Sequence, residues 1–402
     1  MMDYTLFGES HGAAVGVLIR NIPAGIPVDG NLIANQLLRR RAADELATAR
    51  HEADEVEFLS GVFQGKTTGM PLTAILRNKD VRSEDYETLR AAPRPGHADY
   101  TAWVQSGGCN DYRGGGHFSG RLTAPLTVAG ALAQTYLNSC GITIQASVVE
   151  EEALRRRAAE AKAEGDSVGG QIACTIIGVP AGIGGPDWTC ALESEISRHI
   201  FAIPAVKAVG FGLGEGFAAA RGSEANDALR TDGQRIYTAT NHAGGINGGI
   251  SNGMPITFTV TFRPTPSIAK EQETVNLDTM TNTTAAIRGR HDACVALRAV
   301  PAVEAAAALA LCQLIEPDSD DIAVLRKEID AVDIKIVELF EKRLEIAGKI
   351  GKYKAQNHLP VFDAEREEVV LHSRGDLAPE HRQQVETLYR TIMALSREEQ
   401  KQ

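Results

Sequence analysis

The residues best suited to chemistry are histidines, arginines and an aspartate set among glycines in the first three quarters of the chain. They occur in six segments: GESHG (8–12), RPGHAD (94–99), DYRGGGHFSGR (111–121), NHAGGINGG (241–249), RPTPS (263–267) and GRHDAC (289–294). Glycine lets backbone N–H groups approach a ligand closely, and guanidinium forks match phosphate and carboxylate oxygens. Histidine and aspartate beside them can move protons. The pattern predicts a site that binds anions and performs acid–base chemistry on them.

Composition narrows the class of protein. The 402 residues carry a formal net charge of −11, so the arginine clusters lie within an acidic whole. Nucleic-acid-binding proteins normally show a basic face, so we expect small anionic ligands and no nucleic acid. The six cysteines are scattered without C-x-x-C or zinc-type spacing, which indicates free thiols, no metal site and a reducing cytoplasm. No signal peptide and no run of about 18 apolar residues is present, so we expect no membrane span.

The elements that must position these residues alternate between strand-like and helix-like runs. Short β-branched runs bounded by Gly or Pro predict strands over 15–19, 171–179 and 256–262. Ala/Leu-rich runs predict helices over 123–137 and 302–314. A charged segment between 148 and 165 predicts a solvated helix whose arginines face water. The alternation indicates an α/β fold.

An internal repeat organises this part of the chain. IPAGI (22–26) recurs as VPAGI (179–183), and GKTTGMPLT (65–73) recurs as GISNGMPIT (249–257). In each copy a helix-like run and then a strand-like run ending in glycine lie between the two strings. Matching order and matching residues predict a duplicated β/α unit, with two similar halves facing a shared cleft.

The composition changes at EPDSDD (316–321), and a helical region begins. Its apolar residues recur at alternating three- and four-residue steps over ~35 residues, a heptad seam far longer than an average helix of ~12. These residues are Ile322, Leu325, Ile329, Val332, Ile336, Leu339, Ile346, Ile350 and Tyr353. Such a helix needs a partner along its length. Pro360 ends it, and further helices are predicted from about Asp363 and Pro379. We therefore expect domains at 1–316 and 322–402, joined by a linker at 317–321.

Polar residues interrupt the apolar pattern of this helical region. Arg343 occupies a seam position that should be apolar, and Lys354, eleven residues on, lies within ~20° of it and ~16 Å away along the helix. Arg326 falls ~100° from the Arg343 face, so it suits a site on a neighbouring subunit better than its own. Spacing of three or four residues places further polar groups on shared faces: Asp363, Arg366 and Glu367 on the second helix, and Ser396 and Gln400 on the third.

These residues resemble those of the all-helical type II chorismate mutases over about residues 320–400. The resemblance implies a three-helix chain in an intertwined dimer that rearranges chorismate to prephenate without a nucleophile or cofactor. The site folds the substrate into a chair and stabilises charge on its ether oxygen. It implies that Arg343 and a partner's Arg326 bind the carboxylates and that Lys354 hydrogen-bonds the ether oxygen. The remaining site positions match Asp363, Arg366, Glu367, Ser396 and Gln400, the last in a catalytic place.

GESHG, RPGHAD, DYRGGGHFSGR and GRHDAC, in that order, resemble the chorismate synthases over nearly all of residues 1–316. The resemblance implies a β–α–β sandwich with internal pseudo-twofold symmetry, usually assembled as a tetramer. It implies an anti 1,4-elimination of phosphate from 5-enolpyruvylshikimate 3-phosphate that gives chorismate. The reaction requires reduced FMN although it is redox-neutral. NADPH would be the reductant, used either by this enzyme or by a separate source of reduced flavin.

The same resemblance assigns roles to single residues. His11 is the acid that supports the departing phosphate or protonates reduced flavin, and His97 is the second proton donor, to the flavin. Asp292 would help flavin N5 take the substrate proton. Substrate phosphate and carboxylates would be held by Ser10, Arg40, Arg50, Arg94, Arg121 and Arg290. The flavin positions match His117, Phe118, Ser119, Ala205, Gly248, Arg263, Pro264, Thr265, Pro266, Ser267 and again Arg290.

Together these features predict a bifunctional cytoplasmic enzyme of the shikimate pathway, a homotetramer or larger, whose second domain uses the product of the first. Three alternatives remain open. The helical domain could serve only in dimerisation or regulation, although the polar seam residues argue against this. The first domain could be a flavin oxidoreductase that consumes NADPH stoichiometrically. A non-catalytic anion-binding protein would leave the set of His11, His97 and Asp292 unexplained.

Overall fold

A computed structural model describes residues 2–41, 46, 52–79, 90–185, 187–287, 292–315 and 322–400. The chain divides into two compact units, Met1–Pro317 and Asp318–Gln402. The first unit contains both sheets that carry the repeat, and the described residues of the second form helices joined by loops, with no strand among them.

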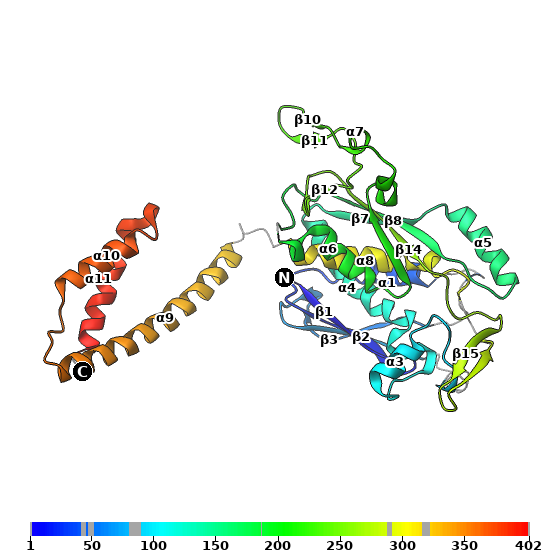
Figure 1. The fold of residues 1–402 in the computed structure, drawn as a ribbon, viewed down its shortest axis with the longest axis horizontal. Coiled ribbons are helices and arrows are strands. Elements are labelled where there is room, and N and C mark those ends of the chain that lie inside the picture. Colours follow the sequence, from blue (N-terminus) through cyan, green and yellow to red (C-terminus); the bar gives the residue numbers. More distant parts are fainter. Residues whose placement is uncertain are drawn as a thin grey trace. The chain divides into compact units, whose positions relative to one another are not determined.

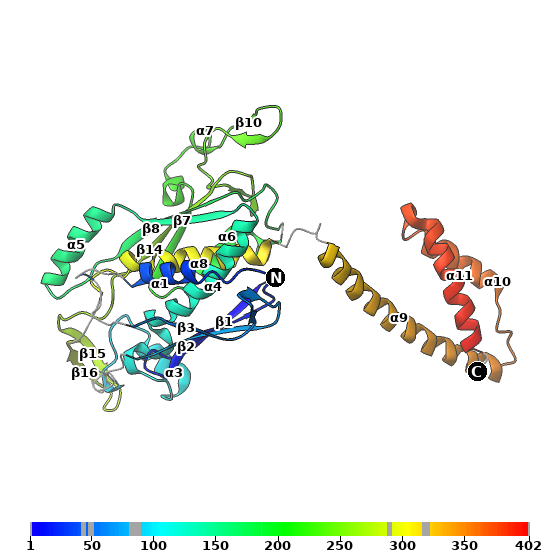
Figure 2. The same ribbon diagram turned by 180° about the vertical axis from the view of Figure 1, so that it is seen from behind.

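The first unit is built from two four-stranded antiparallel sheets with helices between them (Figures 1 and 2). The first sheet has the order β1 (Asp3–Gly8), β2 (Ala14–Arg20), β6 (Leu72–Arg77), β3 (Val56–Ser60). The second has the order β7 (Thr143–Val148), β8 (Gly170–Ile177), β14 (Ile256–Phe262), β9 (Val206–Phe211). The layer between them contains α1 (Gly30–Arg40), α4 (Thr123–Ser139), α6 (Leu192–Phe201) and α8 (Ala296–Leu314). This arrangement confirms the predicted β–α–β sandwich.

The two sheets share one strand order, which confirms the duplicated unit. The repeat extends to side-chain hydrogen bonds at its turns. Thr67 Oγ1 accepts a hydrogen bond from the Ile26 N–H (3.0 Å) and donates to the Pro23 carbonyl (2.6 Å). Ser251 makes the same two bonds, at 2.9 and 2.6 Å, to the last and second residues of VPAGI. Each half therefore closes its turn with a hydroxyl that satisfies two backbone groups.

The core lies where α4 and α8 cross. A Cβ on Gly130 would lie 2.1 Å from the Cβ of Ala305, so glycine is required for this close approach. Helix α8 begins at Ala296, six residues before the predicted start, and includes Pro301. Among the described residues α8 alone has the length and hydropathy of a membrane span, and most of it is buried inside this unit, as expected of a core helix.

The strand predicted over 256–262 coincides with β14, and those over 15–19 and 171–179 lie within or largely within β2 and β8. The charged segment forms α5 (Glu151–Ala163), which buries only Leu154 and Ala158. Shorter helices are α3 (Asp99–Ser106) and α7 (Gly222–Ala225). Short hairpins complete the unit: β4 (Val62–Phe63) with β5 (Lys66–Thr67), β10 (Leu229–Thr231) with β11 (Ile236–Thr238), β12 (Ile246–Asn247) with β13 (Ile250–Ser251), and β15 (Gln272–Asn276) with β16 (Thr281–Ala285).

The second unit has the three predicted helices, α9 (Ile322–Gln356), α10 (Ala364–Gly375) and α11 (Arg382–Glu399). Helix α11 packs against both others. The 35 residues of α9 match the length of the heptad seam. Four seam residues toward its N-terminal half remain 54–67% exposed within one chain: Ile329, Val332, Ile336 and Leu339. Along this stretch, no helix in the described part of the same unit covers the seam. The partner helix that the pattern predicts must therefore come from elsewhere.

Candidate active sites

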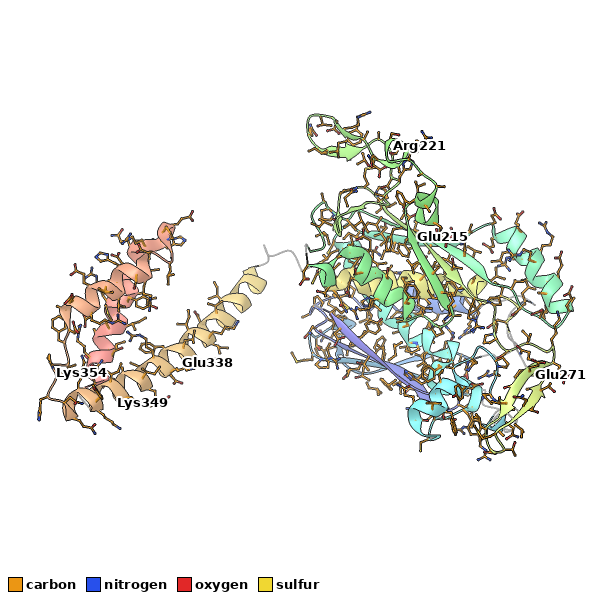
Figure 3. All side chains as sticks on the ribbon, in the orientation of Figure 1. Glu215, Arg221, Glu271, Glu338, Lys349 and Lys354 are labelled. Atoms are coloured by element: carbon orange, nitrogen blue, oxygen red, sulfur yellow. The ribbon has the colours of Figure 1, made fainter. Side chains whose placement is uncertain are left out.

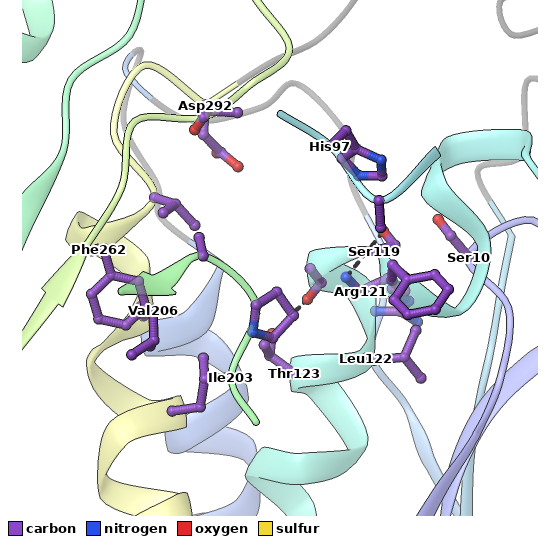
Figure 4. Close-up of a pocket in the computed structure, with 18 of the residues that line it drawn as sticks. Ser10, His97, Ser119, Arg121, Leu122, Thr123, Ile203, Val206, Phe262 and Asp292 are labelled. Atoms are coloured by element: carbon purple, nitrogen blue, oxygen red, sulfur yellow. Dashed lines mark hydrogen bonds between the residues drawn. The ribbon is translucent and has the colours of Figure 1, made fainter. Parts of the chain in front are cut away.

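A cavity of about 690 Å³ opens in the first unit, and both halves of the repeat contribute to its walls (Figure 4). One wall comes from the GESHG turn, the end of α1, RPGHAD and the glycine loop that leads into α4. The other comes from residues 201–207, the RPTPS segment and the start of α8. The predicted residues that line this cavity are Ser10, His11, Arg40, Arg94, His97, His117, Phe118, Ser119, Arg121, Ala205, Arg263, Thr265, Pro266, Ser267 and Asp292.

Four predicted residues are not placed in this wall. Arg50 and Arg290 lie outside the described residues. Pro264 is not a lining residue, and its carbonyl accepts a hydrogen bond from Arg263 Nε (3.3 Å). Gly248 lies in the β12–β13 turn, next to Gly249, whose carbonyl accepts from the Leu192 N–H. Leu192 begins α6 and the cavity lies at the other end of that helix, about 14 Å away at 1.5 Å per residue, so one chain does not bring Gly248 to the cavity.

A buried carboxylate joins two of the predicted arginines. Asp54 Oδ2 lies 2.8 Å from Arg40 Nη2, and Asp54 Oδ1 pairs with Arg121 Nη1. Burial opposes ionisation of Asp54, but the two guanidiniums outweigh it and hold the pKa of this carboxyl below its ordinary value. Burial lowers the pKa of Arg40 to about 10, with Asp54 opposing that change, so Arg40 stays cationic at neutral pH. Sequence reasoning missed Asp54, which belongs to no recognised motif.

A second buried pair orients His97. Arg94 Nε and Nη2 bind the two oxygens of Asp99 at 2.7 and 2.8 Å, and Arg94 Nη1 donates to Ser267 Oγ (3.0 Å). Asp99 Oδ1 lies 2.6 Å from His97 Nδ1. A carboxylate only accepts, so this contact places a proton on Nδ1 and leaves Nε2 for proton transfer. Burial opposes the charge on Asp99, but Arg94 and His97 hold its pKa well below the ordinary range. Asp99 stands inside RPGHAD, yet sequence reasoning gave it no role.

The glycine loop makes room for both histidines. Gly114 and Gly115 have φ of +59° and +87°, a region that side-chain-bearing residues rarely adopt. A Cβ on Gly114 would lie 2.2 Å from His11 Nδ1, and a Cβ on Gly115 would lie 2.9 Å from His97 Cε1. Neighbouring glycines therefore face the two candidate proton donors. This is a steric reason for the repeated glycines of DYRGGGHFSGR.

The opposite wall is largely apolar. Phe201, Ile203, Val206 and Phe262 line it. Ala205 between them has φ of +74°, and its carbonyl accepts from the Arg263 N–H (2.9 Å). An apolar surface beside a few fixed polar groups is the usual composition of a site for a flat organic ligand.

The cavity wall also contains a buried hydroxyl and an additional ion pair. Thr265 Oγ1 is buried and has no hydrogen-bond partner among the described residues. Asp292 Oδ2 lies 3.4 Å from Arg298 Nε, on the first turn of α8. Arg298 lines the cavity and contributes to lowering the pKa of Arg40, so it adds another guanidinium to this region. Sequence reasoning missed Arg298 because it lies just outside GRHDAC.

The helical unit brings several predicted residues together. Arg343 Nη1 on α9 donates to Ser396 Oγ on α11, and Ser396 is buried. Lys354, near the end of α9 (Figure 3), donates through Nζ to the Val361 carbonyl at 2.9 Å. Gln400 Oε1 is buried and has no hydrogen-bond partner within the described chain. The side chain of Arg326 lies outside the described residues.

The predicted residues of α10 have less uniform surroundings. Asp363 caps the helix by accepting from the Arg366 N–H (2.9 Å), and the Arg366 side chain is exposed. Both oxygens of Glu367 accept from Arg397 Nη1, at 2.5 and 2.6 Å. The Arg397 guanidinium also lies over the Phe362 ring, 5.5 Å from its centroid. Sequence reasoning missed Arg397. It directly follows Ser396, and adjacent residues on a helix point in different directions, so the spacing did not place Arg397 on the predicted face.

Comparisons with known proteins identify the family that each unit matches. The family model of chorismate synthase matches residues 2–315, and that of chorismate mutase type II matches residues 325–401. A chorismate synthase of Thermococcus gammatolerans is 44% identical over 338 residues (77% of this chain, 95% of the relative), and one of Chitinophaga pinensis is 46% identical over 313 (77% and 93%). A chorismate synthase crystal structure superposes with a TM-score of 0.60 at 24% identity, covering 78% of this chain and 91% of its own, which supports the fold. The chain therefore belongs to the chorismate synthase family, and its C-terminal unit matches chorismate mutase type II.

Proposed function

We propose that the first unit eliminates phosphate from 5-enolpyruvylshikimate 3-phosphate to give chorismate, and that the second rearranges chorismate to prephenate. The observation that supports the first reaction best is one cavity that joins several arginines with two histidines, His11 and His97. The leaving group is a phosphate dianion, and guanidiniums in a site shielded from water stabilise such a charge most effectively. The two reactions share chorismate, so one chain would produce and consume it in the cytoplasm.

The side chains divide the work by position. Arg40 and Arg121, fixed by Asp54, would bind anionic oxygens of the substrate. His97, with Nδ1 held by Asp99, would present Nε2 as a proton donor. His11, beside the glycine loop, would donate a proton on the side of the departing phosphate. Asp292, on the wall with Arg298, would assist removal of the proton that leaves the substrate.

The same cavity fits reduced FMN beside the substrate. Its volume of about 690 Å³ lies within the range of small-molecule sites. The apolar wall suits a flavin ring, and Thr265 Oγ1 offers a buried polar atom that lacks a partner among the described residues. Residues that would hold the flavin are His117, Phe118, Ser119, Ala205, Arg263, Thr265 and Ser267. When bound, reduced FMN would supply an electron-rich ring beside the bond that breaks, with NADPH as the source of its electrons.

The decisive experiment for this reaction measures phosphate and reductant together. The full chain is mixed, in the absence of oxygen, with 5-enolpyruvylshikimate 3-phosphate and dithionite-reduced FMN. The amount of FMN is smaller than the amount of substrate. We expect many phosphates released per flavin, because the elimination is redox-neutral. Release of no more than one phosphate per reduced flavin would instead indicate a flavin oxidoreductase that consumes its reductant stoichiometrically. Flavin binding without phosphate release would contradict the proposal.

The proposed mutase reaction is supported by Arg343 and Lys354 on one helix, with Ser396 bonded to Arg343. We expect Arg343→Ala to abolish most prephenate formation from chorismate while the oligomeric state is kept. Lys349→Ala, which removes an exposed cation that pairs with Glu345, is the matched control and should retain activity. Retained mutase activity in Arg343→Ala would contradict the role assigned to Arg343. Absence of that activity from the unmodified chain would favour a helical unit that only dimerises or regulates.

The exposed seam of α9 supports a proposed intertwined pairing of helical units. Residues that are 54–67% exposed at heptad spacing would be covered by a second copy, which would also lend Arg326. Pairing through the helical units, added to contacts of the first unit, gives the homotetramer that we propose. Sedimentation of the full chain tests this, and a monomer at micromolar concentration would contradict it.

A further inference from the structure

Asp54 occupies an unusual place between the two anion-binding arginines. Its side chain is 0% exposed although it lies at the cavity wall, and each of its oxygens pairs with a different guanidinium. Arg40 ends α1, whereas Arg121 lies in the 3-10 turn Gly120–Leu122 before α4. One carboxylate therefore connects two elements that are distant in sequence. Both oxygens are engaged, so Asp54 has no free acceptor for a ligand, and its charge would repel an anion.

The backbone at Asp54 is also unusual. Its φ of +52° lies in the left-handed region, which aspartate and asparagine tolerate better than most residues. Such conformations are strained and persist where the surrounding structure requires them. Here the conformation places the carboxylate under the two arginines, just before β3 begins at Val56.

The pairing with Asp54 leaves one buried donor of each guanidinium unused by the described residues. Arg121 Nε donates to Asn78 Oδ1 (3.1 Å), and the Asn78 amide donates to the carbonyls of Glu9 (3.0 Å) and Gly12 (2.9 Å) in the GESHG turn. Arg121 Nη2 and Arg40 Nε have no hydrogen-bond partner among the described residues. Arg41 Nε also lies 3.4 Å from Asp54 Oδ2. Three guanidiniums and one carboxylate leave two net positive charges. Asp54 and Asn78 hold the guanidiniums in place, and unused donors remain for an anion, as an anion-binding site requires.

We propose that Asp54 is a positioning residue that holds Arg40 and Arg121 as one preorganised fork for an anionic group of the substrate. The proposal rests on the proposed phosphate elimination for the identity of that substrate. It assigns Asp54 no contact with the reacting atoms.

The first test is Asp54→Asn in the full chain, with Asp3→Asn as control because Asp3 forms an exposed pair with Arg20. Asparagine keeps the shape and tolerates the backbone conformation, but its single acceptor oxygen cannot hold both guanidiniums. We expect kcat/KM for 5-enolpyruvylshikimate 3-phosphate to fall about tenfold or more, mostly through KM, because a buried charged pair is broken. Flavin affinity and mutase activity should stay unchanged. A loss below about twofold, as in the control, would overturn the proposal.

A double-mutant cycle separates positioning from general damage. Arg121→Lys keeps the charge and removes the fork. If Asp54 acts through the arginines, adding Asp54→Asn to Arg121→Lys should lower kcat/KM less than about threefold further. If Asp54→Asn lowers kcat/KM equally in the unmodified chain and in Arg121→Lys, the proposal is overturned. General misfolding would give this result, because its effect does not depend on Arg121.

Failure of the proposed function would be visible separately. If the unmodified chain releases no phosphate from the substrate, the elimination itself is contradicted. The affinity of the four cycle members for inorganic phosphate, measured by calorimetry, then tests Asp54 without catalysis. Coupling between Asp54→Asn and Arg121→Lys would support the positioning role, and independent effects would overturn it.

Discussion

The two halves of the repeat meet at one cavity but contribute opposite chemistry to it. Helix α1 and helix α6 each follow a PAGI turn and precede a strand of their own sheet. The end of α1 carries Arg40 and is followed by Arg41, whereas the end of α6 carries Phe201 and is followed by Ile203. All four line the cavity. Equivalent places in one duplicated unit thus supply cations on one side and an apolar surface on the other.

This difference separates what the repeat keeps from what it varies. The turn is the same in both halves, because Thr67 and Ser251 make matching hydrogen bonds to the backbone. The helix ends, which line the cavity, differ completely. The turns and sheets of the two halves can therefore stay the same while the two walls of the cavity differ. One wall suits an anionic substrate and the other suits a flat apolar ring.

The largest effect is expected on the cationic wall. Arg121→Ala should lower kcat/KM for phosphate release by about 10²- to 10³-fold, because it removes a fixed donor to developing anionic charge. Arg20→Ala is the control, since Arg20, at the end of β2, forms an exposed pair with Asp3. Steady-state phosphate release measures both. A similar loss in the control, or none in Arg121→Ala, would contradict the assignment of the wall.

The glycine loop should be nearly as sensitive. Gly114→Ala drives a methyl group into His11, which lies 2.2 Å from the added Cβ. We expect kcat to fall about tenfold to hundredfold, because small displacements of catalytic groups have effects of this size. Gly25→Ala is the matched control, with a similarly positive φ of +87° but nothing within 4 Å of the added Cβ. It should lose stability only; equal losses of kcat would argue against a steric role.

The apolar wall gives a smaller effect of another kind. Phe201→Ala should weaken reduced-flavin binding about fivefold, because an aromatic contact contributes about 1 kcal/mol. KM for the phosphorylated substrate should change little. Fluorescence titration of flavin and steady-state kinetics report the two quantities. If KM rises while flavin affinity is unchanged, the apolar wall binds the substrate instead of the flavin, and the assignment of the two walls is wrong.

Acid should remove a stabilising contribution from the cationic wall. The pKa of Asp99 is lower in the folded chain than its ordinary value of about 3.9. As pH falls from about 5, the unfolded state therefore binds the proton first, and the free energy of unfolding decreases. Asp99→Asn should flatten this decrease, measured by urea unfolding at stepped pH. Glu57→Gln, at an exposed pair with Arg77, should flatten it far less.

The smallest effect tests the shared frame. Thr67→Val and Ser251→Ala should each lower the free energy of unfolding by about 1–2 kcal/mol, because each leaves a backbone N–H without its acceptor. Ser60→Ala, at an exposed hydroxyl, is the control. Denaturant unfolding of the three variants would show whether the two turns are energetically equivalent. A large difference between the first two would mean that the halves differ in frame as well as in chemistry.

Much of this architecture could be predicted from the sequence because local patterns determine it. The β-branched run 256–262 is β14, the heptad seam has the length of α9, and the repeated strings mark two turns with matching bonds. Helix α8 was predicted to begin too late because Arg298 and Pro301 interrupt its apolar run, yet the helix includes both.

The groups that sequence reasoning missed are charged partners brought close only by folding. Asp54, Asp99 and Arg397 each pair with a predicted site residue. For Asp54 and Arg397 no periodicity or motif specifies the partner, since its distance depends on how separate elements pack. Asp99 lies inside RPGHAD, but its place in the motif does not show which side chains it bonds. Gly248 shows the reverse case, because a residue matched by its motif lies near the wrong end of α6 within one chain.

The measurement that tests the central claim most directly is product identity in a single incubation. The full chain is supplied with 5-enolpyruvylshikimate 3-phosphate and reduced FMN without oxygen, and the products are separated. We predict prephenate with one phosphate released per substrate, since both sites lie on one chain. Chorismate without prephenate would contradict catalysis by the helical unit, and absence of phosphate despite bound flavin would contradict the elimination itself.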